Sequence, residues 1–158
     1  MKKWFQVISY AIALLVIFQS CQQSEGNHEN YVKLESLLPE ENLGELGAVI
    51  VVPLENACSP CSISTLQQIS QIDQKFKSKV QVVLTAKSFK LIDQMIDDID
   101  LSGFRVHRDG DYLFWKHQMV LNSPAYYLIK DNSIDSEGTI AVPDLPGFVK
   151  TLLLHLDS

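Results

Sequence analysis

The sequence predicts an α/β protein, with a central mixed β-sheet that has helices on both faces. β-Branched apolar runs alternate along the chain with segments whose apolar residues recur every three or four positions, and such alternation produces parallel strands joined by helices. Near the C-terminus, short apolar segments flank a polar turn, which adds an antiparallel hairpin. The 158 residues, 46% hydrophobic and 20% charged, have the balance of one globular core.

The N-terminus has the pattern of an export signal. Lys2 and Lys3 precede an apolar core, residues 11–18, and a Ser-Cys pair follows that ends at Cys21. This ending resembles that of bacterial lipoproteins, in which the cysteine becomes the lipid-modified first residue. The apolar part is shorter than the roughly 20 residues of a membrane span. We expect residues 1–20 to be a lipoprotein-type signal peptide, with an uncleaved anchor or an ordinary secretory signal as alternatives; all three place the domain outside the cytoplasm.

A polar segment separates this signal from the globular part. Residues 22–30 have the composition of a flexible tether. Residues 31–38 are either a short strand or a helix on the domain edge, broken by Pro39. We therefore expect a tether region, residues 21–43, that begins with the lipidated cysteine, followed by a globular domain, residues 44–158.

The globular domain begins with alternating strands and helices. The apolar run AVIVVPL is typical of a strand buried on both faces, and Pro53 marks its end. Residues 80–85 form a second strand, after which Ser88 caps a helix. The helix before this strand has its apolar face at Ile63, Leu66, Ile69, Ile72 and Phe76. The helix after it has its apolar face at Phe89, Ile92, Met95, Ile96 and Ile99.

The domain ends in a hairpin and a helix. Residues 104–107 read as a third strand and residues 112–115 as a short aromatic-rich helix. Residues 125–130 and a short strand around residues 139–142 flank the turn DNSIDSEG. A last helix, rich in leucine, is capped by Asp144.

The charge excludes some classes of partner. The net charge is -6, and removal of the first twenty residues leaves 11 basic and 19 acidic side chains. Nucleic acid and anionic membrane surfaces are therefore not expected as partners.

The stretch NACSPCS places Cys58 and Cys61 three positions apart, directly after the first strand. A closed zinc site needs four ligands, and no second cysteine pair exists. The histidines fall on separate predicted elements, so we expect no metal. A purely structural disulfide is also a weak reading, because closing so short a loop removes only about 2 kcal/mol of unfolded-state entropy.

A redox role has a positive mechanism. Cys58 lies at the N-terminus of the predicted amphipathic helix, where free amide N–H groups and the helix dipole stabilise a thiolate. Cys61, one turn further in, can then attack a mixed disulfide and release the reduced partner. The pair therefore favours dithiol-disulfide exchange.

These features together resemble the thioredoxin superfamily: a strand, Cys-x-x-Cys at a helix start, a strand, a helix, then NSPAYYLI and a hairpin. FRVHRDGD followed by MVLNSPAYYLIKDNSIDSEGTI is similar to one branch of it, the TlpA-like membrane-anchored extracytoplasmic thiol-disulfide reductases. The resemblance covers about residues 47–156 and implies a thioredoxin-like fold.

The resemblance also implies roles for individual residues. Cys58 would be the attacking thiol and Cys61 the resolving one. Pro124 would be a cis-proline beside the active-site disulfide, and substrate would dock along the Ser123 backbone by strand-like hydrogen bonds.

The residues between the cysteines, Ser59 and Pro60, would contact substrate and bear on redox direction. A proline next to the second cysteine is shared with reducing members of the superfamily. We therefore expect the protein to reduce disulfides of client proteins.

The chain departs from the family pattern at several positions. Ala57 stands where the family has Trp, and Val52 and Ser64 stand where thioredoxins and the TlpA-like branch have acids. Glu55 reads as a solvated loop carboxylate near the site. Trp115 reads as packing, not as a replacement for the missing Trp.

The expected protein is thus a monomeric thiol-disulfide oxidoreductase in the bacterial envelope, on the periplasmic side, held to a membrane by lipid on Cys21. Its partners would be client protein thiols and a membrane electron donor, and its only cofactor the Cys58–Cys61 disulfide. The alternative is a peptide-binding or folding-assistance lipoprotein on the same fold. A thiol peroxidase would need Thr at position 55, which is Glu55.

Overall fold

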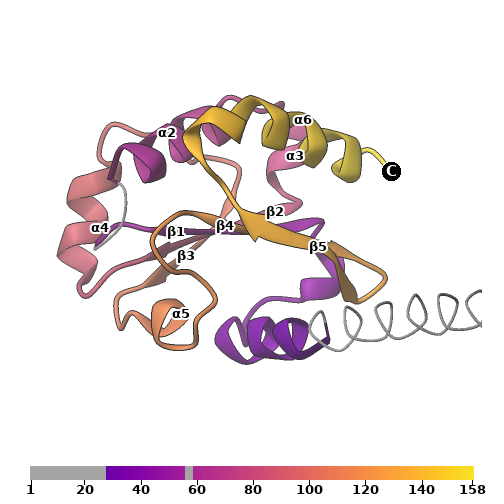
Figure 1. The fold of residues 1–158 in the computed structure, drawn as a ribbon, viewed down its shortest axis with the longest axis horizontal. Helices are drawn as coiled ribbons and strands as arrows, with labels where there is room; N and C mark the ends of the chain where they lie inside the picture. The colour runs from indigo at the N-terminus through magenta and orange to yellow at the C-terminus, as the bar shows by residue number, and fades with distance from the viewer. Residues whose placement is uncertain (1–27, 56–58) are drawn as a thin grey trace, which may run out of the picture.

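The computed structural model describes residues 28–55 and 59–158. Residues 28–37 are helical and precede all labelled elements. The elements that follow are η1 (Leu43–Glu45), β1 (Ala48–Pro53), α2 (Ser59–Ser70), α3 (Gln74–Lys77), β2 (Val80–Thr85), α4 (Phe89–Ile96), β3 (Arg105–Asp109), α5 (Leu113–Lys116), β4 (Ala125–Lys130), β5 (Ser133–Thr139), η2 (Val142–Asp144) and α6 (Leu145–Leu156) (Figure 1).

The strands form a five-stranded sheet in the order β3-β2-β1-β4-β5. β1, β2 and β3 are parallel, and β4 and β5 are antiparallel to their neighbours. Because β1, β2 and β3 advance across the sheet in one direction, right-handed crossovers place α2 and α4 on the same side of it. The predicted mixed α/β sheet with helices on both faces is confirmed.

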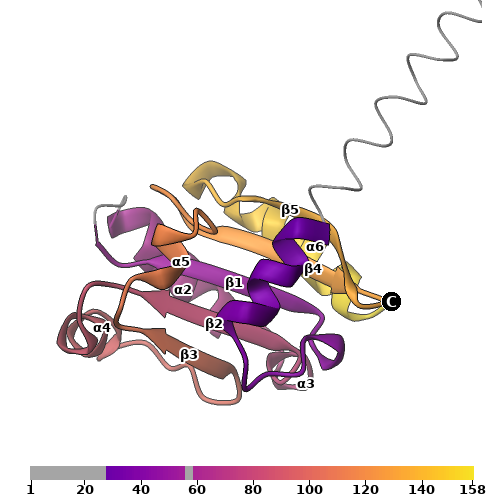
Figure 2. The ribbon, with the colours of Figure 1, turned by 90° about the horizontal axis from the view of Figure 1, so that it is seen from below.

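Each face of the sheet has its own hydrophobic core. α2, α3 and α6 cover one face, and the N-terminal helix and α5 lie against the other (Figures 1 and 2). Alternate residues of β1 enter the two cores, as a strand covered on both faces requires. The first core includes Ile50, Val52, Leu66, Ile69, Ile92 and Leu152. The second includes Leu34, Leu38, Val49, Val51, Phe114 and Tyr127.

The segment for which a strand and a helix were both possible, residues 31–38, forms a helix up to residue 37. Its apolar side chains at three- and four-residue spacing, Tyr31, Leu34 and Leu38, are buried against the sheet. Residues 28–30, expected in the tether, belong to this helix.

The predicted first helix is divided in two. α2 ends at Ser70, and Phe76 belongs to the separate short helix α3. The cause is local, because the Asp73 side chain accepts a hydrogen bond from the Lys75 N–H and caps a new helix there. Ile72 and Phe76 nevertheless both reach the same core.

Helix α4 is shorter than predicted. Ser88 caps it as expected, with its hydroxyl accepting from the Leu91 N–H. Ile99 lies beyond its end, and Phe89 is exposed instead of joining the apolar face. The Phe89 ring fills the space that a Cβ on Gly110 would occupy, so it covers the end of β3.

The hairpin is tighter than predicted, and its second strand comes earlier. Asp131 and Asn132 both have positive φ, the geometry of a two-residue hairpin turn. β5 therefore covers Ser133–Thr139, and the expected strand around residues 139–142 is wrong. The polar residues that looked like a long loop form an exposed edge strand with only Ile134 fully buried.

The remaining elements follow the prediction closely. β2 and β4 have the expected bounds, and β3 and α5 are shifted by one or two residues. Asp144 stands at the N-cap of α6, but its side chain makes no capping hydrogen bond because its backbone is already helical, continuing from η2.

Candidate functional site

The candidate site lies where the parallel strands reach their C-terminal ends, and this end of the sheet is called its edge below. Pro53, Thr85 and Asp109 close β1, β2 and β3 and are successive Cα partners across the sheet. β4 runs antiparallel to β1 and pairs Ala125 with Val51, so Pro124 reaches the same edge. Helix α2 also begins there. The structure therefore brings the predicted proline segment and the Cys-x-x-Cys helix to one edge.

The two predicted cysteines are described only in part. Cys61 lies half-buried in the first turn of α2 and is disulfide-bonded. Cys58, Cys21 and residues 56–57 lie outside the described residues, so the Cys58–Cys61 pairing stays a prediction. Ser59 and Pro60 begin α2 and are exposed.

The start of α2 is anchored to the end of β1. The Ser62 hydroxyl, fully buried, donates a hydrogen bond to the Pro53 carbonyl at 2.5 Å. The Leu54 N–H donates to the Thr85 carbonyl at 3.0 Å. Both sides of the segment that carries the first cysteine are thus attached to the sheet.

Glu55 is held in place and is not a free loop carboxylate. Its side chain accepts a hydrogen bond from the Lys87 N–H at 3.1 Å and lies 3.5 Å from the Lys87 ammonium. Its carbonyl accepts a hydrogen bond from the Tyr112 hydroxyl at 3.2 Å. The residues following β1, β2 and β3 are therefore joined to one another.

Asp109 holds the turn into α5. Its buried carboxylate accepts hydrogen bonds from the Thr85 hydroxyl at 2.6 Å and from the Leu113 and Phe114 N–H groups at 2.9 Å each. These two N–H groups are among the unpaired donors of a helix N-terminus. The carboxylate thus caps α5 from the end of the neighbouring strand.

An aromatic pair lies beside this turn. The Trp115 ring stacks on the Tyr112 ring, with centroids 5.1 Å apart and an interplanar angle of 7°. Trp115 is 40% exposed, which confirms that it packs at the surface. It lines a pocket of about 510 Å³ with Tyr112, Lys87 and Lys116.

Sequence reasoning missed Lys87, Asp109 and Tyr112 as residues that shape the site. A signal existed for Lys87 and Asp109, because each lies two residues after a predicted strand. Tyr112 begins the predicted short helix and had no such signal. The carboxyl ends of parallel strands meet at one sheet edge, which is where ligands bind in open α/β sheets.

The expected cis-proline is wrong. Peptide bonds in the described residues are trans, including Ser123–Pro124. The trans form is lower in free energy by about 0.5 to 1 kcal/mol. Pro124 is buried, and its carbonyl accepts a hydrogen bond from the Ile140 N–H at 2.7 Å, which extends the β4–β5 pairing; Ser123 is half-buried. Their role in substrate binding stays a prediction.

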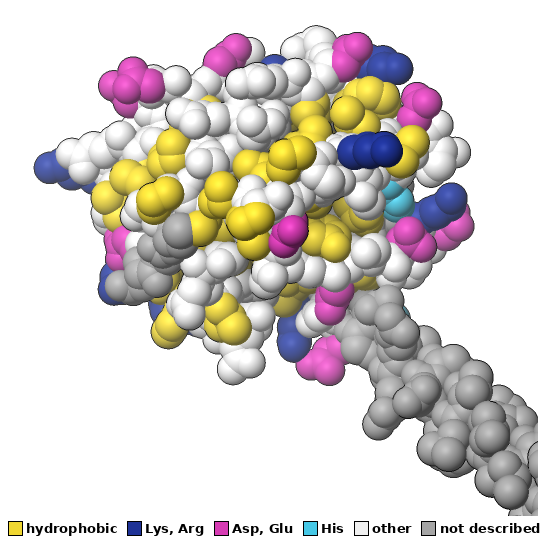
Figure 3. All heavy atoms as spheres, turned by 45° about the horizontal axis from the view of Figure 1, so that its top comes forward, with side chains coloured by type: hydrophobic (Ala, Val, Ile, Leu, Met, Phe, Trp, Pro, Cys, Tyr) yellow, Lys and Arg dark blue, Asp and Glu magenta, His cyan; other side chains and the backbone are white. Residues whose placement is uncertain are grey.

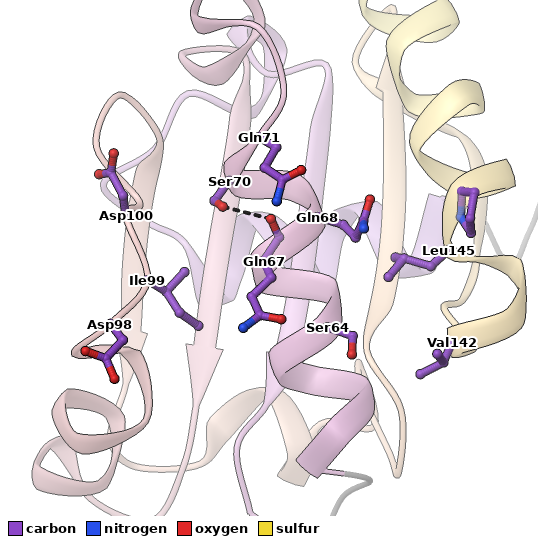
Figure 4. Close-up of a pocket in the computed structure, with 11 residues that line it drawn as sticks. Ser64, Gln67, Gln68, Ser70, Gln71, Asp98, Ile99, Asp100, Val142 and Leu145 are labelled. Carbon is purple, nitrogen blue, oxygen red and sulfur yellow. Dashed lines mark hydrogen bonds between the residues drawn. The ribbon is translucent and has the colours of Figure 1, made fainter.

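The structure provides no acid at the positions where the family has one. Val52 is fully buried in the first core. Ser64 lines a groove of about 440 Å³ along α2, together with Gln67 and Leu145. The acids of that groove, Asp98 and Asp100, lie across α2 from Ser64 (Figure 4).

The predicted signal peptide, residues 1–20, lies outside the described residues. Within residues 28–55 and 59–158, no helix is long and apolar enough to cross a membrane. In the same residues, no group of three or more His, Cys, Asp or Glu side chains is placed to hold a metal ion.

No protein-family model matches the chain, and no curated protein matches its sequence. Its structure is similar to a crystal structure from Chlorobium tepidum described as a thiol:disulfide interchange protein, DsbE. The TM-score is 0.57, and the match covers 72% of this chain and 82% of that chain at 18% identity. The chain has a thioredoxin-like fold. The thioredoxin-like fold confirms the fold class that was predicted from the order of elements and motifs along the chain.

Proposed function

We propose that this protein is an extracytoplasmic thiol-disulfide oxidoreductase that reduces disulfides of client proteins through Cys58 and Cys61. The observation that carries the proposal is a disulfide-bonded cysteine in the first turn of the helix that follows the central strand of a thioredoxin-like sheet. The structural neighbour is itself described as a thiol:disulfide interchange protein, which supports the same chemistry.

The exchange would proceed in two displacements. The Cys58 thiolate attacks one sulfur of the client disulfide, forms a mixed disulfide and releases the other client sulfur as a thiolate. The Cys61 thiolate then attacks the Cys58 sulfur and breaks the mixed disulfide. The client gains two electrons and two protons, and the protein is left with a Cys58–Cys61 disulfide.

The position of Cys61 in the first turn of α2 supports this order of attack. Residues at the start of a helix lie close to its unpaired N–H groups, which favour a thiolate over a thiol. Cys61 is half-buried behind the exposed Ser59 and Pro60, as suits a thiol that attacks only an already bound partner.

The proposal includes the cellular setting read from the sequence. Lipid on Cys21 would hold the domain to a bacterial membrane on the periplasmic side, and a membrane donor would supply two electrons to restore the dithiol. Pro60 beside the second cysteine favours the reducing direction.

A second candidate is a peptide-binding or folding-assistance lipoprotein with lapsed redox activity. The residues at the two positions where the family has acids favour it, since Val52 and Ser64 cannot move protons during exchange. Under this alternative the half-buried Ser123, next to the buried Pro124, would bind extended peptides through its backbone.

The reduction potential of the purified full chain distinguishes the two. Equilibration in glutathione buffers, followed by alkylation and mass spectrometry, should give one two-electron transition shared by Cys58 and Cys61, at a potential near that of reducing thioredoxin-like proteins, with Cys58 alkylated faster at neutral pH. A pair that resists reduction, or a Cys58 no more reactive than a free thiol, would favour the binding module.

A further inference from the structure

We propose that Tyr112 is a positioning residue for this exchange: through the Glu55 carbonyl, it fixes the backbone that leads into Cys58. The inference rests on the proposed function, and it adds a residue that acts from a different strand of the sheet. Glu55 is the last described residue before the segment that carries Cys58.

Glu55 is held from two neighbouring strand ends at once. Its carboxylate is bound by the backbone N–H and the ammonium group of Lys87, which follows β2. Its carbonyl accepts a hydrogen bond from the hydroxyl of Tyr112, a residue that follows β3. Since the carbonyl is a backbone group, the Tyr112 bond constrains the path of the main chain itself.

Tyr112 is well supported for this task. Its backbone has φ of 60°, a left-handed conformation uncommon for a residue other than glycine. The next residue, Leu113, is fixed in turn, because its N–H donates a hydrogen bond to the Asp109 carboxylate. The ring is 4% exposed, stacks against Trp115 and has the Lys87 ammonium 5.9 Å from its centroid. The hydroxyl is therefore held by a rigid side chain.

The other end of the cysteine segment is anchored separately. The buried Ser62 hydroxyl bonds the Pro53 carbonyl, so the turn of α2 that carries Cys61 is attached to β1. Under this proposal, Tyr112 fixes Glu55, three residues before Cys58, and thereby raises the effective concentration of the Cys58 thiol toward Cys61 when the disulfide is reduced.

A looser approach to Cys58 would lower that effective concentration. Disulfide formation within the pair would then become less favourable relative to glutathione, and the reduction potential would rise. The resolving step would slow for the same reason, so mixed disulfides would persist longer.

The test is the variant Tyr112→Phe, which removes the hydroxyl and keeps the ring. In the full chain carrying Cys21→Ser, Cys58 and Cys61 are the only thiols. We expect the equilibrium constant for forming the disulfide from glutathione to fall about three- to tenfold, which is a potential about 14 to 30 mV higher. Glu55→Ala removes the hydrogen bond and ion pair between the Glu55 carboxylate and Lys87, so this variant should also have a higher reduction potential.

Tyr127→Phe is the matched control. It also removes a buried tyrosine hydroxyl, one that donates to the Met119 carbonyl in the second core, away from Glu55. It should lower the thermal midpoint without moving the potential. If the parent pair titrates but Tyr112→Phe leaves the potential unchanged, the positioning role is overturned and the proposed function stands. If the parent pair does not titrate at all, both are overturned.

Discussion

At the scale of single residues, Gln81 is the least favourable feature of the described core. It is the second residue of β2 and fully buried, and neither its amide nitrogen nor its oxygen has a hydrogen-bond partner. A buried polar group without a partner costs about 1 to 3 kcal/mol. Gln81→Met keeps the length of the side chain and removes that cost.

We therefore expect Gln81→Met to raise the free energy of unfolding by about 1 to 2 kcal/mol. Urea denaturation should show a higher midpoint with an unchanged slope. The same exchange at the exposed Gln68 should change stability by less than about 0.5 kcal/mol. A destabilised Gln81→Met protein would mean that the amide has a partner in solution.

Tyr127 makes the stability depend on pH in the alkaline range. Burial, and to a lesser extent the negative charge of Glu137, raise the pKa of Tyr127 well above its usual value, and burial with Glu35 raises the pKa of Tyr31. In the unfolded chain tyrosine loses its proton near pH 10, while these tyrosines keep theirs in the folded state. The unfolded state then binds fewer protons, so stability falls as pH rises.

The midpoint concentration for denaturation by guanidinium chloride should thus stay level up to about pH 9.5 and be clearly lower at about pH 11. Tyr127→Phe should make the fall shallower, because one of the raised groups is gone. A midpoint that rises over this range would contradict the assignment.

At the scale of elements, α5 depends on a carboxylate from another strand. Asp109 accepts hydrogen bonds from Thr85, Leu113 and Phe114 while buried. Asp109→Asn replaces one acceptor oxygen with an amide that faces donors, so we expect a loss of about 1 to 3 kcal/mol by urea denaturation. The exposed Asp111→Asn should stay within about 0.5 kcal/mol. Equal effects at both positions would disprove the capping role.

The differences between predicted and observed elements have one kind of cause. Helix and strand types followed from periodicity, but their ends were decided by single side chains or turns. Asp73 starts α3 inside an otherwise continuous helical pattern, and Asp131 with Asn132 turns the hairpin after two residues. Such short-range hydrogen bonds and positive φ angles leave no mark in hydrophobic periodicity.

At the scale of the whole molecule, we expect the fold not to depend on its cysteines. Each face of the sheet has a separate apolar core, and the helical face also leaves hydrophobic side chains at its surface in a broken band (Figure 3). Leu154 on α6 is 66% exposed. Cys61 belongs to neither core, so opening the disulfide would remove no core contact of its own.

We expect the full chain with all three cysteines changed to serine to keep its far-ultraviolet circular dichroism spectrum. Its free energy of unfolding should fall by only about 2 kcal/mol, the entropy of closing a four-residue loop. Loss of the folded spectrum would show that the disulfide is structural, and would remove the basis of the proposed exchange.

The sequence by itself determined the fold class, the strand bounds of β2 and β4, and the placement of Cys61 at the start of a helix. These follow from hydrophobic period and from motif order, which are properties of the chain alone. The tertiary structure decided that residues 28–37 are a helix packed on the sheet, that Pro124 is trans, and that Glu55, Lys87 and Tyr112 meet. Those contacts join residues far apart in sequence, and only the order of strands across the sheet brings them together.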